Sequence, residues 1–149
     1  MATATKKRDR GLLDFLQMEK NVWAPDVKLD LLVRSIRHGL PMSAFVALKT
    51  ELDVGDTVLA RIVDISPRTL TRRKQEGRLQ PAESDRLWRI GYLFERASKL
   101  LGGPERAREW FKRPKKALGG KTPLEYTDTE PGAIEVEDLL GRLEHGVFS

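Results

Sequence analysis

Five side chains between residues 68 and 75 form a pattern that suits hydrogen bonding to an anionic polymer. They are Arg68, Thr69, Arg72, Arg73 and Gln75. Each guanidinium group is a rigid fork of donors, and the amide and hydroxyl groups can both donate and accept. This combination predicts contacts to the phosphates and base edges of DNA rather than a chemical reaction.

A short helix over residues 67–76 must position these side chains. Ser66 can accept hydrogen bonds from the free N–H groups of a first turn, and Pro67 suits the first helical position because it needs no donor there. Gly77 supplies the stop. If Leu70 points inward, a rotation of about 100° per residue places three side chains on the opposite face, with Thr69 beside them: Arg68, Arg72 and Gln75.

A preceding helix over residues 56–65 would complete a helix-turn-helix. Apolar residues fall where two such helices pack: Leu59, Ala60, Val63, Ile65 and Leu70. Two positions differ from the usual pattern, since many such units have glycine where Asp64 stands and a branched apolar residue where Arg73 stands. Asp64 can adopt the left-handed conformation at modest cost. The alternative is an ordinary helical hairpin whose arginines are solvated.

The distribution of charge indicates two partners. Residues 1–60 carry 9 Lys/Arg and 8 Asp/Glu, residues 61–116 carry 16 and 7, and residues 117–149 carry 2 and 7. A basic middle suits a polyanion, whereas a polyanion would repel the acidic end. The acidic end should therefore face a different molecule.

Composition excludes several classes of protein. The 149 residues contain no cysteine, no secretory leader and no apolar run of about 20 residues, which predicts a cytoplasmic protein without a membrane span. The two histidines lie far apart, and His38 has no second His or Cys nearby. With no phosphate-binding glycine loop and no recognisable carboxylate pair, we expect no enzyme, metal site or cofactor.

Hydrophobic spacing and cap residues predict an all-α fold. The predicted helices cover residues 11–18, 26–39, 43–52, 56–65, 67–76, 81–101, 105–112 and about 128–144, with a single turn at 122–125. Because Gly102-Gly103-Pro104 interrupts the pattern, we divide the chain there. The division gives a basic disordered tail at residues 1–10, a helix-turn-helix domain for DNA binding or dimerisation at 11–102, and a C-terminal domain at 103–149.

The longest predicted helix, residues 81–101, is a candidate for dimer formation. Three aromatic residues on it, Trp88, Tyr92 and Phe94, could anchor an interface between two copies. A dimer would place two recognition helices about 34 Å apart on a partly palindromic operator. Burial of the aromatic side chains in the core of one chain is the alternative.

The last predicted helix ends in an apolar segment that no later residues cover. Its apolar stripe comprises Val136, Leu139, Leu140, Leu143 and Val147, and Gly146 is a natural C-terminal cap. Val147 and Phe148 follow. Such an end either folds back on its own domain or enters a partner.

Several ordered blocks of residues closely resemble the Xre/MbcA/ParS antitoxin family. The blocks are Ser66-Pro67-Arg68-Thr69-Leu70-x-Arg72-Arg73, Ser84-Asp85-Arg86-Leu87-x-Arg89, Ala107-x-Glu109-Trp110-Phe111-x-x-Pro114, Ala117-Leu118-Gly119-Gly120-Lys121-Thr122-Pro123-Leu124 and Asp138-Leu139-Leu140-Gly141-Arg142-Leu143-Glu144-His145-Gly146. The likeness runs from about Ala60 to Ser149. It implies an Xre-type helix-turn-helix domain followed by a small, mostly helical toxin-binding domain.

The resemblance also implies partners. Members of the family bind a RES-domain toxin, an NAD-consuming enzyme with an ADP-ribosyltransferase-like fold, and obstruct its NAD pocket largely through the C-terminal domain. The complex commonly represses its own promoter. Carried over to this chain, the toxin-facing residues would be Arg142, Glu144, His145, Gly146, Val147, Phe148 and Ser149.

Two other functions remain open from the sequence. The chain could be a DNA-binding transcriptional regulator without a toxin partner, or an antitoxin whose helix-turn-helix serves dimerisation alone. Tight binding of the neighbouring gene product would distinguish an antitoxin from a regulator without a toxin partner. The salt dependence of DNA binding would test whether the helix-turn-helix contacts DNA or serves dimerisation alone.

Overall fold

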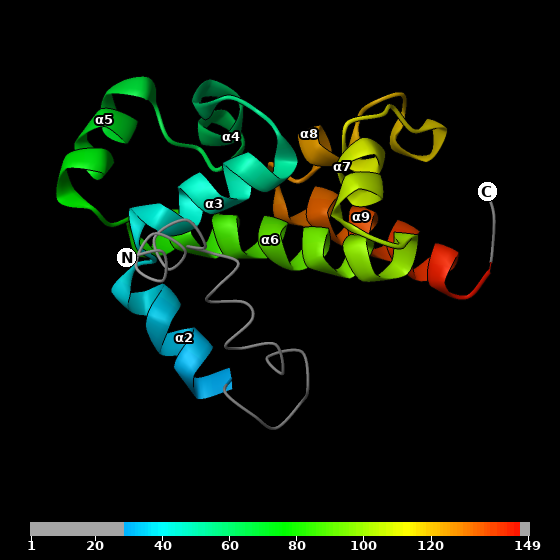
Figure 1. Ribbon diagram of the computed structural model, residues 1–149, viewed down its shortest axis with the longest axis horizontal. Coiled ribbons are helices and arrows are strands. Elements are labelled where there is room, and N and C mark those ends of the chain that lie inside the picture. Colours follow the sequence, from blue (N-terminus) through cyan, green and yellow to red (C-terminus); the bar gives the residue numbers. More distant parts are fainter. Residues whose placement is uncertain (1–28, 147–149) are drawn as a thin grey trace, which may run out of the picture.

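The computed structural model describes residues 29–146, which form helices grouped around one long central helix (Figure 1). The elements are α2 (Leu29–His38), α3 (Met42–Leu52), α4 (Asp56–Ile62), α5 (Pro67–Glu76), α6 (Pro81–Leu101), α7 (Pro104–Phe111), the 3-10 turn η1 (Lys116–Leu118), α8 (Pro123–Tyr126) and α9 (Glu130–Glu144). Between residues 29 and 146 the only β pairings are two isolated bridges. The predicted all-α fold is confirmed. The predicted tail at residues 1–10 and the predicted helix at 11–18 lie outside the described residues.

The central helix α6 has the predicted bounds because both of its ends are specified locally. Pro81 occupies the first turn, Gln80 and Glu83 form a reciprocal capping box, and Gly102 ends the helix with φ 96°. Along its length, the apolar residues that recur every three or four positions are buried: Leu87, Ile90, Phe94 and Ala97. Figure 1 shows α3 along the first half of α6 and α2 below its start, α4 and α5 farther from it, and α7 and α9 beside the second half.

Two loops are joined beside the start of α6. The Met42 N–H donates to the carbonyl of Gly77, and the Leu79 N–H donates to the carbonyl of Leu40, both over 2.9 Å. Gly39 is required here because it has φ 99° and a Cβ would lie 2.2 Å from the Leu79 carbonyl oxygen. The buried Ser84 hydroxyl accepts from the Leu40 N–H over 2.7 Å. These contacts fix where α5 ends relative to α6.

One buried apolar cluster joins the helices before and after Gly102. It includes Leu48 and Leu59 from the first half of the chain and Phe111, Val136 and Leu140 from the second. The division that we placed at Gly102-Gly103-Pro104 therefore lies between helices that share a core. No helix within residues 29–146 is long and apolar enough to cross a membrane.

Candidate functional site

The turn between α4 and α5 has the geometry that the sequence predicted. Asp64 adopts φ 62°. Its N–H donates to the Arg61 carbonyl over 3.1 Å, and the Ile65 N–H donates to the Ala60 carbonyl over 2.7 Å. This is a Schellman motif, completed by the buried side chain of Ile65. An aspartate thus fills the position where glycine is usual.

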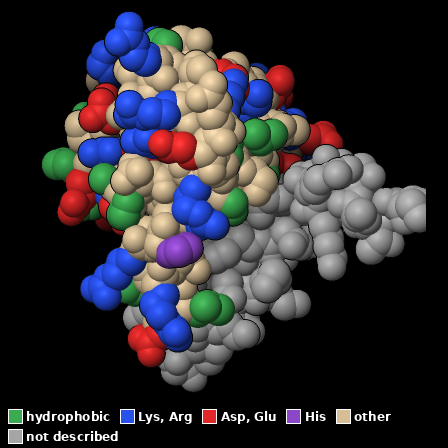
Figure 2. Space-filling view, turned by 90° about the vertical axis from the view of Figure 1, so that its left-hand side faces the viewer, with side chains coloured by type: hydrophobic (Ala, Val, Ile, Leu, Met, Phe, Trp, Pro, Cys, Tyr) green, Lys and Arg blue, Asp and Glu red, His purple; other side chains and the backbone are tan. Residues whose placement is uncertain are grey.

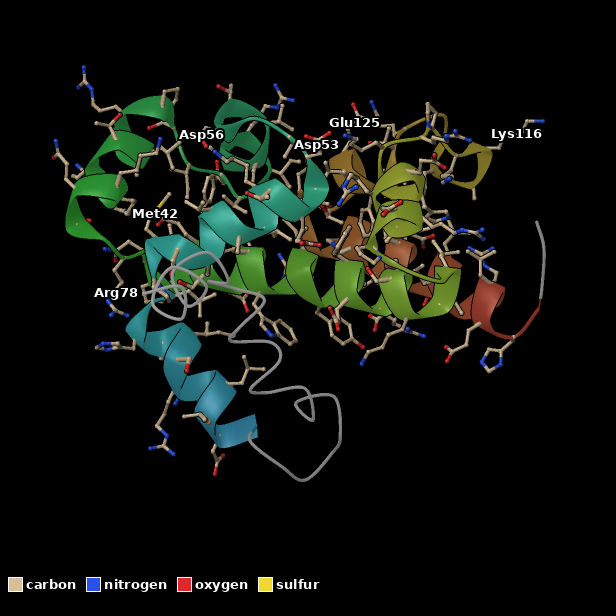
Figure 3. The ribbon with its side chains drawn as sticks, in the orientation of Figure 1. Met42, Asp53, Asp56, Arg78, Lys116 and Glu125 are labelled. Atoms are coloured by element: carbon tan, nitrogen blue, oxygen red, sulfur yellow. The ribbon has the colours of Figure 1, made fainter. Side chains whose placement is uncertain are left out.

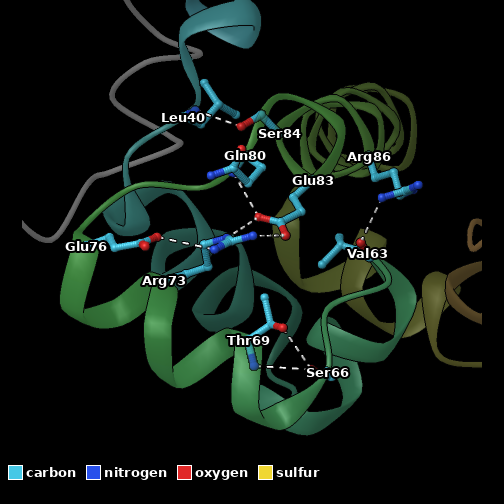
Figure 4. Close-up of polar contacts among 10 residues, drawn as sticks. All are labelled: Leu40, Val63, Ser66, Thr69, Arg73, Glu76, Gln80, Glu83, Ser84 and Arg86. Atoms are coloured by element: carbon cyan, nitrogen blue, oxygen red, sulfur yellow. Dashed lines mark hydrogen bonds and ion pairs between the residues drawn. The ribbon is translucent and has the colours of Figure 1, made fainter.

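The start and end of α5 are also those predicted. The Ser66 hydroxyl accepts from the Thr69 N–H over 3.2 Å and lies 3.0 Å from the Thr69 hydroxyl (Figure 4). Pro67 occupies the first turn, and Gly77 ends the helix with φ 79°. The hydroxyl of Thr69 is therefore already in use at the helix start.

The outer face of α5 presents donors to solvent. The side chains of Arg68, Arg72 and Gln75 are exposed, that of Thr69 is partly buried, and that of Leu70 points into the core. Figure 2 looks onto the end of the molecule that carries α5 and shows Lys and Arg side chains spread over its upper part, with acidic side chains among them. The arrangement leaves both arginines free to reach an anionic partner.

The structure separates Arg73 from this face, so we correct its assignment to the DNA-contacting set. Arg73 is 7% exposed and Glu83 of α6 is 8% exposed. Arg73 Nε donates to Glu83 Oε1 over 2.8 Å, and a second guanidinium nitrogen donates to Oε2 over 3.0 Å (Figure 4). The hydrogen bonds with Glu83 raise the pKa of Arg73. The guanidinium is thus buried at a position where many such units carry an apolar residue.

A second ion-pair cluster ties α5 to α3 and α4. Asp56, at the start of α4 (Figure 3), lies 2.8 Å from the Lys49 ammonium and 2.6 Å from the Lys74 ammonium. Hydrogen bonds from Lys49 and Lys74 lower the pKa of Asp56. Lys74 is therefore partly neutralised by the protein itself, whereas Arg68 and Arg72 on the same helix have no recorded acidic partner among the described residues.

The second candidate surface is formed by α9. Thr129 caps the start of this helix, because its hydroxyl accepts from the Gly132 N–H over 3.1 Å. Val136, Leu139 and Leu140 are buried as predicted. The outward side carries a half-exposed Ile134 and a row of exposed charged residues: Glu135, Asp138, Arg142 and His145.

The end of α9 is attached to α6 by Arg96. This guanidinium lies 3.2 Å from Glu137 and 2.9 Å from Glu144, and the Tyr92 hydroxyl donates to Glu137 over 3.2 Å. Of the predicted toxin-facing residues, Arg142, His145 and Gly146 are exposed, and Glu144 is exposed but held by Arg96. Val147, Phe148 and Ser149 lie outside the described residues.

The three aromatic residues proposed for a dimer interface occupy different environments. Trp88 and Tyr92 are partly buried, and their rings stack at 5.3 Å. Phe94 is 2% exposed, and its ring centroid lies 5.9 Å from that of Phe111. Phe94 is therefore a core residue, and we correct its assignment to an interface.

Three residues that organise these surfaces were not singled out from the sequence: Asp56, Glu83 and Arg96. Glu83 follows Gln80 and Pro81 at the spacing of a capping box, so its place in a first helical turn could have been found. Its pairing with Arg73 could not, because the two residues belong to different helices. In the part of the chain that is described, no group of His, Asp or Glu could hold a metal ion.

Both candidate surfaces, on α5 and on α9, lie in regions of the chain that match known protein families. Residues 31–91 match the antitoxin Xre-like helix-turn-helix domain, and residues 96–146 match the antitoxin Xre/MbcA/ParS C-terminal toxin-binding domain. The second match begins inside α6, so this helix contributes to both regions.

Relatives cover most of the chain. It is 36% identical over 132 residues to antitoxin Xre of Yersinia enterocolitica, which covers 87% of this chain and 89% of the relative. It is 34% identical over 116 residues to antitoxin Xre of Photorhabdus laumondii, with 76% and 78% covered. Antitoxin Xre of Pseudomonas putida is 32% identical over 80 residues, with 53% and 50% covered.

Proposed function

The chain belongs to the Xre family of antitoxins, and from this premise we propose that it neutralises a RES-domain toxin by obstructing the toxin's NAD pocket with its C-terminal region. It carries the helix-turn-helix domain and the toxin-binding domain of that family. The observation that carries the proposal is the position of α9, which lies within the matched toxin-binding domain and turns a charged side toward solvent. The chain acts as a binding protein and catalyses no reaction of its own.

Charge supports α9 as the approaching element. Its exposed side carries Glu135 and Asp138, and Glu130 lies at its start. A pocket that holds the phosphates of NAD should be basic, so an acidic helix is attracted to it. Replacing Glu135 by Gln and Asp138 by Asn should slow association with the toxin, and the difference from wild type should shrink at high salt.

The residues beyond α9 are proposed to enter the pocket. Phe148 would supply an apolar anchor there. Gly146 is exposed with φ 74°, so the chain leaves the helix there. Deleting residues 147–149 should release toxin activity while the helical content stays unchanged. Full inhibition by the truncated protein would exclude this plug.

Cellular NAD tests the toxin proposal directly. The product of the neighbouring gene is induced alone, with the full-length chain and with the truncated chain, and NAD is measured in each culture. NAD should collapse with the toxin alone and recover with the full-length chain. If NAD never changes and the two proteins do not co-purify, the alternative of a regulator without a toxin partner is favoured instead.

The exposed face of α5 supports a second role, which is repression of the chain's own operon as a homodimer. Replacing Arg68 or Arg72 by Ala should weaken DNA binding and lower the salt slope by about one for each phosphate contact removed. Lys116, which Figure 3 places at the other end of the molecule from α5, is exposed, and its replacement by Ala is the matched control. Unchanged binding in both arginine variants would assign the helix-turn-helix to dimerisation alone. Trp88 and Tyr92 on α6 remain the proposed dimer contacts.

A further inference from the structure

The recognition helix α5 has little buried surface of its own. Of its ten residues, only Leu70 and Arg73 are buried. They lie three positions apart, so their side chains leave the helix on the same face, about 60° apart around the helix axis. Leu70 is therefore the only apolar anchor of this helix. Because apolar packing is non-directional, Leu70 alone does not fix the rotation of α5 about its own axis.

Backbone hydrogen bonds at Gly77 and Leu79 fix where α5 ends, but the other side-chain attachments of α5 restrain its roll weakly. The Lys74–Asp56 ion pair is made by a flexible, compact ammonium group whose side chain is 48% exposed. The bonds at Ser66 lie within the first turn of α5 itself. Neither contact fixes how far α5 is rolled about its own axis.

The contact between Arg73 and Glu83 does impose a direction. Its two hydrogen bonds, 2.8 and 3.0 Å long, hold a planar guanidinium against a planar carboxylate. Glu83 is itself fixed, because its Oε1 also accepts from the Gln80 N–H over 2.8 Å at the start of α6. The Arg73–Glu83 contact therefore sets the rotation of α5 about its own axis relative to the backbone of α6.

Small changes in this roll would matter for base reading. A roll of about 20° moves an atom about 6 Å from the helix axis by about 2 Å. Hydrogen bonds to base edges tolerate only a few tenths of an ångström. Buried ion pairs are weak sources of net stability but can select one arrangement among several.

We propose that Arg73 is a positioning residue for DNA recognition, whose fork to Glu83 sets the roll of α5 and thereby decides which bases Arg68, Arg72 and Gln75 reach. This inference rests on the proposed DNA binding. It separates two roles on one helix. Arg68 and Arg72 contact the DNA, and Arg73 orients them without touching it.

The test replaces the pair without removing the capping box or leaving a buried charge. In the double variant Arg73→Met with Glu83→Gln, methionine fills the space of the arginine stem, and glutamine still accepts from the Gln80 N–H. The probes are a duplex selected by the wild-type protein from a randomised library and a scrambled duplex of the same length and composition. Both are titrated at several salt concentrations with the full chain.

The double variant should keep its helical content and its salt slope, while its preference for the selected duplex falls by about tenfold or more. Arg68→Ala should instead lower the salt slope. Arg89→Ala, which removes an arginine of α6 that pairs with exposed Asp85 at 3.6 Å, should change neither quantity. If the double variant does not fold, Arg73→Lys replaces it, since lysine keeps the charge but loses the fork.

Each outcome decides the inference. A preference within about twofold of wild type in a folded variant overturns it and leaves the proposed DNA binding intact. A salt slope lowered as in Arg68→Ala also overturns it, because Arg73 would then be a direct contact. If the wild-type protein shows no preference for any selected duplex, base recognition and this inference both fail.

Discussion

The two halves of α6 hold their partner helices in different ways. Near its start, Glu83 holds Arg73 of α5 with both side chains at most 10% exposed. In its second half, Arg96 holds Glu137 and Glu144 of α9, where the side chains are 30 to 52% exposed. A buried charge must be matched by one partner in one geometry, whereas an exposed charge can exchange its partner for water or for another protein. The difference indicates a fixed orientation for α5 and an adaptable end for α9.

Removing Arg73 is the strongest way to challenge this comparison. Arg73→Ala leaves the buried Glu83 carboxylate without its partner, so we expect a loss of about 3–5 kcal/mol in the free energy of unfolding. Urea denaturation followed by circular dichroism measures it. The double variant Arg73→Met with Glu83→Gln should lose less, since no charge remains buried. A loss below about 1 kcal/mol for Arg73→Ala would mean that the pair is effectively solvated.

A glycine at the start of α9 tests whether this end of the helix, unlike its far end at Glu144, is held rigidly. At Gly132 a Cβ would lie 1.8 Å from the Tyr126 carbonyl oxygen, so α8 and α9 are held by close backbone packing. Gly132→Ala should therefore cost about 1–3 kcal/mol of stability. Gly141 of the same helix is the matched control, because a Cβ there would make only an ordinary 3.7 Å contact with Arg96. Gly141→Ala should be neutral or slightly stabilising, and equal losses in the two variants would contradict the packing argument.

Acid should affect the Glu83 pair in a defined direction. Burial alone would raise the pKa of Glu83, but hydrogen bonds from Arg73 and from the Gln80 N–H outweigh it and hold this pKa below the ordinary 4.5. The folded pKa is thus lower than the unfolded one. The stabilisation is complete above the unfolded pKa and is lost as pH falls through the folded pKa.

The double variant Arg73→Met with Glu83→Gln has no carboxylate at this position, so its stability should fall less than that of wild type between pH 7 and about pH 3. Urea denaturation at both pH values measures the difference. Asp56 and Glu125, whose pKa values are also lowered in the wild-type chain, are retained in the double variant, so their contributions should cancel in the comparison. An equal loss of stability in the two proteins would show that ionisation of Glu83 does not stabilise the folded state.

Local signals were enough to predict much of this structure. Caps and glycines set both ends of α5 and α6, and the left-handed Asp64 was expected from the turn that it occupies. Each of these features depends on residues within one turn of the chain. The all-α fold was predicted from hydrophobic spacing and cap residues, and the Xre family from ordered blocks of residues, and both are confirmed.

Contacts between helices were not predictable in the same way. Counting from Leu70 places Arg73 only about 60° away, so the helical period contained a hint of its inward position. An arginine is nevertheless expected to be exposed unless a buried acidic partner is known. The partner here, Glu83, lies in the next helix, so the sequence alone did not reveal the pairing. Phe94 raised the same difficulty, since one sequence does not reveal that Phe111 of α7 covers it.

The smallest effect is expected at Arg96. Arg96→Ala removes two ion pairs that are partly open to water, so the free energy of unfolding should fall by no more than about 1 kcal/mol. Glu137 keeps its hydrogen bond from the Tyr92 hydroxyl, which limits the loss at that carboxylate. Urea denaturation should therefore separate this variant clearly from Arg73→Ala.

Toxin binding adds a second measurement on the same variant. In the wild-type chain Glu144 is held by Arg96 at 2.9 Å, so a toxin that needs Glu144 must first replace this partner. Arg96→Ala frees the carboxylate but also loosens the end of α9, and the two effects oppose each other. Affinity should therefore change by less than about tenfold. A loss of stability as large as that of Arg73→Ala would mean that both halves of α6 hold their partners by equally rigid pairs, and the contrast between a fixed α5 and an adaptable α9 would no longer stand.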